Sequence, residues 1–284
     1  MAGSSLKGEE NFMVYLEFPV RFCQMPKAGF PNSEEYFQEA ERILRLKVDE
    51  TAFVLIDVWD MSRVPKRLVT KSHFSRAREI TEKRIKPALE AARRIHLPII
   101  HAPSSYVAVK YPQYLGLKEK LGVPTPEKKP PKWPPQAFVR ERWREFNGDR
   151  LGERVKDDEV RRSLTYIPEV VKPLDGEFIV ATGEEMNEIL RQKGVLNLIY
   201  VGFATNMCLL NKPGALLEMA HHRGYRTIVL RECTTAMENR ETLPDLLMTK
   251  VFLQWIEMMA LAYTASYRDF IEACEKASME MNKT

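Results

Sequence analysis

The chain has 284 residues, of which 44% are hydrophobic and 29% are charged. This apolar content excludes a disordered chain, and 13 Gly and 18 Pro exclude a collagen-like or linker-dominated one. No stretch approaches the roughly eighteen consecutive apolar residues of a membrane span, so we expect no membrane partner. A net charge of +4 does not by itself indicate nucleic acid as a partner.

The cysteines are Cys23, Cys208, Cys233 and Cys274. They lie far apart and form no CxxC pair, which favours reduced thiols over a disulfide framework. The first residues contain no apolar run of signal-peptide length. We therefore expect a cytoplasmic protein.

Residues 1–50 precede the first regular part of the pattern. They contain a strand-like stretch over 12–18 and an amphipathic stretch over 36–46. We interpret them as an extension that packs on the edge of the core or on a second subunit, and we expect a homo-oligomer.

From residue 51 onward, short apolar runs rich in β-branched residues alternate with helical patterns. The runs cover 51–57, 97–101, 196–202 and 225–231, and a further short one covers 261–264. Near-continuous apolar runs are typical of parallel strands that are covered on both faces. The alternation predicts an α/β fold with three αβα layers and a doubly wound, mainly parallel sheet in strand order 3-2-1-4-5-6. Residues 51–284 form the predicted domain.

The helical patterns carry recognisable end signals. Thr182 and Glu185 fit a capping box at the start of one helix, and Gly194 fits a left-handed cap at its end. Another helix is predicted over 243–259. Residues 104–168 fall outside the alternation and form a Pro-rich, basic and aromatic insertion, which we expect to be a long loop serving as a lid, a binding element or a dimer contact.

Ligands of open α/β sheets bind beyond the carboxyl ends of the strands, where Asp57, His101 and Cys208 follow predicted strands. A thiol at a helix start is expected to have a lowered pKa, because the helix dipole stabilises thiolate. The alternative is that Cys208 is a small buried apolar residue and Asp57 a turn or helix-cap residue. The shared crevice favours chemistry.

Four sequence elements resemble the isochorismatase-like cysteine hydrolases, the superfamily of nicotinamidases and N-carbamoylsarcosine amidases. They are Leu55-Ile-Asp57, Lys172 six residues before Phe178, Gly202-Phe-Ala-Thr-Asn-Met-Cys208, and Gly224-Tyr225. The resemblance covers about residues 50–265. It implies an isochorismatase-like fold.

By this resemblance Asp57 is the general base, Lys172 the supporting cation and Cys208 the nucleophile. The resemblance also implies a cis peptide between Phe203 and Ala204, which would aim the N–H groups of Ala204 and Cys208 at an oxyanion. Taken alone, Lys172 is an ordinary surface lysine. No Asp-x-His metal motif follows the second strand, so we expect neither a metal nor another cofactor.

Five further residues are expected to contact a small-molecule substrate: Trp59, His101, Tyr106, Glu177 and Thr205. Each has an alternative interpretation as a packing or solvated residue. His101 is expected to be a hydrogen-bonded wall, and Glu177 to recognise a cationic or amide group.

The predicted reaction is metal-independent cleavage of an amide, ureide or imide C–N bond through a thioester on Cys208. Two alternatives remain open at this point. One is vinyl ether hydrolysis of the isochorismatase type, which uses no thiol. The other is a non-catalytic protein whose basic, aromatic insertion binds RNA or an acidic protein.

Overall fold

The computed structural model describes residues 13–122, 133–147 and 151–283. Residues 123–132 and 148–150 of the predicted insertion, and Phe12 of the strand-like stretch, lie outside the described residues. The strands are β1 (Tyr15–Gln24), β2 (Gln38–Lys47), β3 (Thr51–Ile56), β4 (Ile99–Ala102), β5 (Phe178–Ile179), β6 (Asn197–Gly202), β7 (Arg226–Leu230) and β8 (Tyr263–Ala265). The α-helices are α1 (Lys71–Ile80), α2 (Lys86–Arg94), α3 (Ser105–Ala108), α4 (Pro112–Leu121), α5 (Gln136–Asn147), α6 (Leu151–Leu164), α7 (Gly183–Lys193), α8 (Cys208–Asn211), α9 (Leu247–Met258) and α10 (Tyr267–Met281).

The eight strands form one sheet in the order β2-β1-β8-β7-β6-β3-β4-β5. All neighbours from β8 to β5 are parallel, and these six strands have the predicted 3-2-1-4-5-6 order. The fold class is therefore confirmed, with two antiparallel strands added at one edge. β5 was not predicted as a strand, because two residues are too few to show a period.

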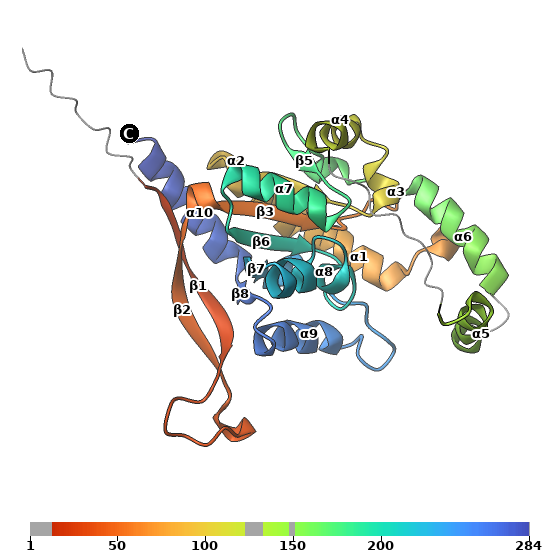
Figure 1. The fold of residues 1–284 in the computed structure, drawn as a ribbon, viewed down its shortest axis with the longest axis horizontal. Coiled ribbons are helices and arrows are strands. Elements are labelled where there is room, and N and C mark those ends of the chain that lie inside the picture. Colours follow the sequence, from red (N-terminus) through yellow and green to blue (C-terminus); the bar gives the residue numbers. More distant parts are fainter. Residues whose placement is uncertain (1–12, 123–132, 148–150, 284) are drawn as a thin grey trace, which may run out of the picture.

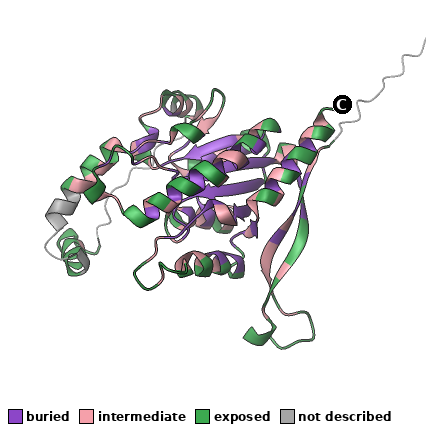
Figure 2. Cartoon of the chain, turned by 180° about the vertical axis from the view of Figure 1, so that it is seen from behind, coloured by how far each residue is buried: buried purple, intermediate pink, exposed green. Residues whose placement is uncertain are grey.

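Helices cover both faces of this sheet and make the three layers visible in Figure 1. On one face α1, α2 and α10 pack against the strands, around Phe53, Leu55 and Phe270. On the other face α7, α9 and the turn of π-helix Leu217–His222 pack around Val54 and Tyr200. Figure 2 shows the buried sheet between helices whose outer surfaces are exposed. None of the described helices is long and apolar enough to cross a membrane.

The described residues before β3 form a long β1–β2 hairpin at the edge of the sheet. Its inner strand joins the sheet through the pairing of Arg21 with Thr264 of β8. The amphipathic stretch near 36–46 is largely β2, and the buried residues Leu44 and Leu46 alternate along it. Beyond the junction with β8 the hairpin extends away from the body of the molecule (Figure 1).

The insertion is not the long loop that we expected, because its described part contains α3, α4, α5 and α6. The prolines obscured these helices in the sequence, since a proline is tolerated in a first turn but ends a helix elsewhere. Lys110 donates to the carbonyl oxygens of Arg162, Ser163 and Thr165 at 2.8 Å each and so caps the C-terminal end of α6. The end of α6 is thereby tied to the body of the domain.

Two predicted helix ends are clear examples of local control. Thr182 and Glu185 form the capping box of α7, and Gly194 ends this helix in the left-handed conformation. The predicted helix over 243–259 instead begins at Leu247, because Asn239 and Thr242 form a hydrogen-bonded turn before it. Side-chain hydrogen bonds of this kind compete with helix formation.

Candidate active site

The candidate site lies where β3, β4 and β6 end together. Ile56 pairs with both Ala102 and Gly202, so the residues that follow these strands are neighbours. A Cβ at Gly202 would lie 1.9 Å from the carbonyl oxygen of Ile56, and Gly202 has a φ of 120°. Only glycine allows this close approach of the two strand ends.

Asp57 is the first residue after β3 and is fully buried. Its φ of 42° is left-handed, a conformation that Asp tolerates better than most residues. The carboxylate accepts hydrogen bonds from Lys212 Nζ at 2.9 Å and from Ser104 Oγ at 3.0 Å. The Cys208 thiol is a third hydrogen-bond donor to it. A buried carboxylate is thus held by one cation and two neutral donors.

Cys208 is the first residue of α8, as predicted, but α8 has only four residues. The expected lowering of its pKa is wrong. Burial and the adjacent Asp57 carboxylate raise the pKa of Cys208 to about 12, although Lys212 and the N–H of Ala204 act in the opposite direction. The thiol is therefore protonated at neutral pH, because burial and then the adjacent carboxylate charge outweigh the partial charge of a short helix end.

The turn before Cys208 is fixed by backbone hydrogen bonds. The peptide bond between Phe203 and Ala204 is cis. Ala204 O accepts from the N–H groups of Met207 and Leu209, and Phe203 N–H donates to Ile56 O of β3. The N–H of Ala204 is left facing the Cys208 sulfur. The turn therefore places a backbone donor beside the thiol.

The lysine beside Asp57 is not the one that the resemblance implied. Lys172 is 56% exposed and is paired with Glu169, so the structure does not bring it to Asp57. Lys212 is 8% exposed and is the cation beside Asp57. Burial lowers the pKa of Lys212, and Asp57 counteracts this. Lys212 lies four residues after Cys208, and Pro213 follows it and ends the helical turn.

His101 and Glu177 contact each other instead of lining a cavity with Cys208. His101 Nε2 lies 3.1 Å from Glu177 Oε2, and Arg93 Nε donates to Glu177 Oε1 at 2.7 Å. Burial raises the pKa of Glu177, but hydrogen bonds from His101, Arg93 and the Leu174 N–H outweigh it and bring this pKa to about 2. Burial lowers the pKa of His101. Glu177, expected to recognise substrate, is therefore a structural carboxylate. His101, expected to be a hydrogen-bonded wall of the pocket, is hydrogen-bonded but does not line the cavity beside Cys208.

Thr205 also differs from its predicted role. Its Oγ1 lies 2.7 Å from Thr234 Oγ1 and its N–H donates to Thr235 O, and the residue is fully buried. It holds the turn against the loop that follows β7. Tyr106 is linked more closely to Asp57 than Thr205 is, because its hydrogen-bond partners are Ser104, which also binds Asp57, and Arg161. Burial raises the pKa of Tyr106, and Arg161 partly counteracts this.

A cavity of about 440 Å³ opens onto the thiol. Its wall is mainly apolar, and it includes Trp59, Ala204 and Cys208 among the predicted site residues. Other residues of the wall are Met61, Leu68, Val69, Phe74, Ala77, Phe203, Met207 and Met237. Trp59 Nε1 is buried and has no hydrogen-bond partner among the described residues. A buried donor without a partner next to a cavity is available to a ligand.

Charged residues at the cavity occur as opposite pairs. Arg67 binds Asp157 at 2.8 Å, and Arg161 binds Asp158 at 3.0 Å. Both carboxylates come from α6, so this helix forms one wall of the cavity. The pairs leave little net charge for a charged ligand to bind.

Sequence reasoning missed Ser104, Lys212 and His73. His73 lines the cavity, its Nδ1 lies 3.1 Å from Ala236 O, and burial lowers its pKa. A signal existed for Lys212, because residues four apart on a helix lie on one face and Lys212 follows Cys208 at that spacing. No such signal existed for His73, whose position depends on packing between α1 and the loop after β7. In the part of the chain that the structure describes, no three His, Cys, Asp or Glu side chains gather as metal ligands.

Comparison with solved structures agrees with this fold. A cysteine hydrolase from Pseudomonas syringae pv. phaseolicola superposes with a TM-score of 0.52 at 17% identity, covering 82% of this chain and 95% of that one. An isochorismatase family protein from Burkholderia thailandensis gives 0.45 at 18%, covering 80% and 96%. N-carbamoylsarcosine amidase from Thermoplasma acidophilum gives 0.40 at 16%, covering 77% and 96%.

No curated protein matches the chain in sequence. The family model of the isochorismatase domain does match it, over residues 51–252, which is most of the chain. This range begins at β3 and contains Asp57, Ser104, Cys208 and Lys212. The chain belongs to the isochorismatase family.

Proposed function

We propose that the chain is a hydrolase that cleaves a C–N bond of a small molecule through a thioester on Cys208. The observation that carries this proposal is the Asp57 carboxylate, which is shared by the Lys212 ammonium and the Cys208 thiol at one end of a 440 Å³ cavity. A nucleophile, a base within hydrogen-bond reach and a third group that orients the base are the parts that acyl transfer requires.

The first step follows from the protonated state of the thiol. Because the pKa of Cys208 is about 12, the free thiolate is rare at neutral pH. The S–H proton therefore passes to Asp57 as the sulfur attacks the substrate carbonyl carbon. Lys212 and Ser104 keep the carboxylate in position during this transfer. The N–H groups of Ala204 and Cys208 are the proposed donors to the oxyanion.

The second half of the reaction returns the proton. The Asp57 carboxyl protonates the leaving nitrogen as the C–N bond breaks, and the thioester remains on Cys208. Water, deprotonated by the same carboxylate, then attacks the thioester carbonyl. The acid product leaves and Cys208 regains its proton, so that atoms and charges balance over the cycle.

The cavity indicates a neutral and mainly apolar acyl group. Its wall is mainly apolar and includes Met, Leu, Val and Phe side chains, and its Arg residues are paired with Asp residues of α6. Trp59 Nε1 is the proposed donor to an acceptor oxygen of the substrate. A buried donor that gains its first partner on binding contributes strongly to specificity.

The direct test is intact mass spectrometry after incubation with a panel of neutral amides, ureides and imides. We expect an acyl adduct that maps to Cys208, and we expect Cys208→Ala to lose turnover by a factor on the order of 10⁴ or more. Cys23→Ala is the matched control, because Cys23 lies on β1 in the hairpin. Undiminished turnover by a folded Cys208→Ala variant would rule out the mechanism.

Alkylation of the thiol separates this proposal from vinyl ether hydrolysis, in which the thiol takes no part. In vinyl ether hydrolysis, treatment with iodoacetamide leaves activity intact, whereas in the thioester mechanism alkylation of Cys208 abolishes it.

Trp59→Phe tests the substrate donor, with an expected rise in KM of about tenfold and a smaller change in kcat.

A further inference from the structure

We propose that the free edge of β2 pairs antiparallel with β2 of a second copy of the chain, with a two-fold axis at Ile43. The two sheets would then form one continuous sheet across both copies. This inference is independent of the proposed hydrolase activity, because it rests on the hairpin and not on the cavity.

The edge strand β2 is long and regular. β2 is the last strand of the sheet and pairs with β1 through a register that is unbroken over ten residues. Natural edge strands are usually short, bulged, interrupted by proline or charged, which prevents pairing with other chains. β2 is long, has no bulge and no proline, and although it is charged, its charges have both signs. Ile43, near the middle of β2, is 65% exposed.

The backbone groups of alternate β2 residues point away from β1. Val48 N–H donates to Val14 O at 3.0 Å, and the register of the hairpin sets these two residues directly opposite each other. Hydrogen-bonded and non-hydrogen-bonded pairs alternate along an antiparallel ladder. The even-numbered residues of β2 therefore bond to β1, and the odd-numbered ones point their N–H and C=O groups outward. Pro19, opposite Ile43, agrees with this because it has no N–H to donate.

The outward-pointing residues, defined as those whose backbone N–H and C=O groups point away from β1, carry an ordered set of charges. Along β2 these are Glu39, Glu41, Ile43, Arg45 and Lys47. If two copies pair antiparallel with Ile43 opposite itself, each Glu41 meets an Arg45 and each Glu39 meets a Lys47. Opposite charges that face each other across strands stabilise pairing, and like charges destabilise it. The strand is therefore complementary to itself in this register.

Registers shifted by one residue pair are less favourable. With Arg42 opposite itself, two like charges meet on the axis and Glu41 meets Ile43. With Leu44 opposite itself, Glu39 has no partner and Ile43 meets Arg45. Only the register centred on Ile43 matches every charged outward residue of one strand with an opposite charge of the other.

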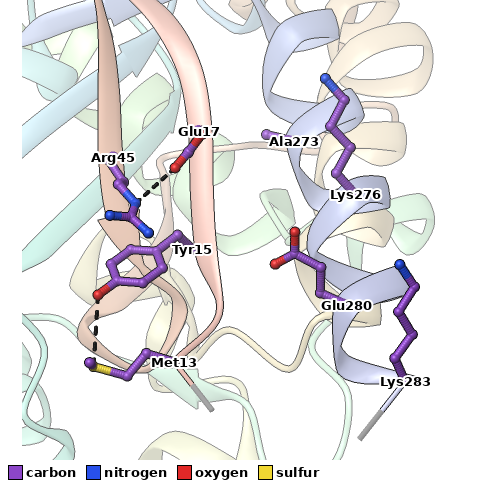
Figure 3. Close-up of a pocket in the computed structure, with 8 residues that line it drawn as sticks. All are labelled: Met13, Tyr15, Glu17, Arg45, Ala273, Lys276, Glu280 and Lys283. Carbon is purple, nitrogen blue, oxygen red and sulfur yellow. Dashed lines mark hydrogen bonds and ion pairs between the residues drawn. The ribbon is translucent and has the colours of Figure 1, made fainter.

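Neighbouring charges extend this pattern across the hairpin. Arg45 Nε binds Glu17 Oε1 of β1 at 2.8 Å, and Figure 3 shows this pair on the hairpin beside α10. Glu41 lies opposite Arg21 of β1. In the proposed dimer the charges therefore alternate in sign over four strands, from Glu17 and Arg45 of one copy to Glu41 and Arg21 of the other. α10 packs on β1, and no strand among the described residues pairs with the outer edge of β2.

Sedimentation velocity over a wide concentration series tests the proposal. We expect the wild-type protein to be a dimer, and we expect Arg45→Glu or Glu41→Arg to weaken dimerisation by a factor on the order of a hundred, because each places two pairs of like charges in the interface. The double variant E41R/R45E restores both intermolecular pairs and recovers the dimer. The Arg45–Glu17 pair is solvent-exposed on both sides, so these variants are expected to fold, which circular dichroism confirms.

A cross-linking experiment tests the register itself. Directly opposite residues of a hydrogen-bonded pair have Cα atoms about 5.5 Å apart, within the range of a disulfide. In a Cys23→Ser background, Ile43→Cys should therefore form a disulfide-linked dimer on mild oxidation. Arg45→Cys is the matched control, because its copies lie about 14 Å apart in this register.

The outcomes separate the possibilities. A wild-type chain that remains monomeric throughout the concentration series overturns the proposal. A dimer that neither Arg45→Glu nor Glu41→Arg weakens, or that Arg45→Cys cross-links better than Ile43→Cys, also overturns it. Loss of the dimer with unchanged amide turnover leaves the hydrolase proposal standing, whereas loss of activity in Cys208→Ala leaves the dimer proposal standing.

Discussion

Two carboxylates with little exposed surface differ in what surrounds them: Asp57 directly follows β3, and Glu177 directly precedes β5. Glu177 accepts hydrogen bonds from Arg93, His101 and the Leu174 N–H. Asp57 accepts from Lys212, Ser104 and the Cys208 thiol beside a cavity. In one region all the partners are structural. In the other, one partner is the Cys208 thiol, which lines a cavity.

This comparison shows that burial of a carboxylate does not by itself identify a reactive group. Glu177 stabilises the connection between α2 and the segment that leads into β5, since Arg93 also donates to Lys172 O at 2.9 Å. Asp57 instead accepts a hydrogen bond from the Cys208 thiol, which lines a cavity. The four predictions below test the contrast, from the largest expected effect to the smallest.

The largest combined effect on stability and turnover is expected for Lys212→Met. It leaves Asp57 buried without a cation, which we expect to lower the free energy of unfolding by about 3 kcal/mol and turnover by a factor on the order of 10² to 10³. Urea denaturation measures the first effect, and hydrolysis of any accepted amide measures the second. A variant as stable and active as the wild type would show that Lys212 has no role in the site.

Asp57→Asn should separate thiol reactivity from catalysis. The substitution removes a charge that raises the pKa of Cys208 and leaves Lys212, which lowers it. Alkylation of Cys208 by iodoacetamide near pH 8 is therefore expected to accelerate about tenfold or more, while hydrolysis is lost because the base is missing. Peptide mass spectrometry measures labelling at each cysteine, and the buried Cys233 and Cys274 report on the folded state. Slower alkylation would contradict the assignment of Asp57 as the dominant neighbouring charge.

Glu177→Gln should change stability in a pH-dependent way. A folded pKa of about 2 against an ordinary value of 4.5 corresponds to about 3 kcal/mol at neutral pH. Because the folded pKa is depressed, this stability is present above about pH 4.5 and is lost as the pH falls toward 2. The difference in unfolding free energy between wild type and Glu177→Gln is therefore expected to shrink between pH 7 and pH 3.

Glu169→Gln is the control for this measurement, because Glu169 is exposed. It should show no comparable difference at either pH. An equally large loss in both variants would mean that the Glu177 cluster has no special contribution.

The smallest effect is expected for Lys172→Met. Its ion pair with Glu169 is exposed, so we expect a change in stability within about 0.5 kcal/mol and unchanged turnover. Activity and urea denaturation are measured beside Lys212→Met. Loss of activity in Lys172→Met with retention in Lys212→Met would reverse the assignment of the two lysines.

Much of the architecture was accessible from the sequence. Near-continuous apolar runs located β3, β4, β6 and β7, and their alternation with helices gave the parallel order. Asp57 and Cys208 were identified because each follows such a run, and the ends of neighbouring parallel strands meet at one edge. The hairpin was less clear, since its strands alternate between exposed and buried residues and only pairing shows which edge they join.

The sequence by itself determined the layers, the strand order and the approach of Asp57 to Cys208, because hydrophobic period and strand ends are local properties. Tertiary structure alone decided which lysine accompanies Asp57, the protonated state of the thiol and the pairing of Glu177 with His101 and Arg93. These depend on which charges come within a few ångströms of one another in the folded chain. Residues 84 positions apart in the chain, such as Arg93 and Glu177, meet only because the sheet brings their segments together.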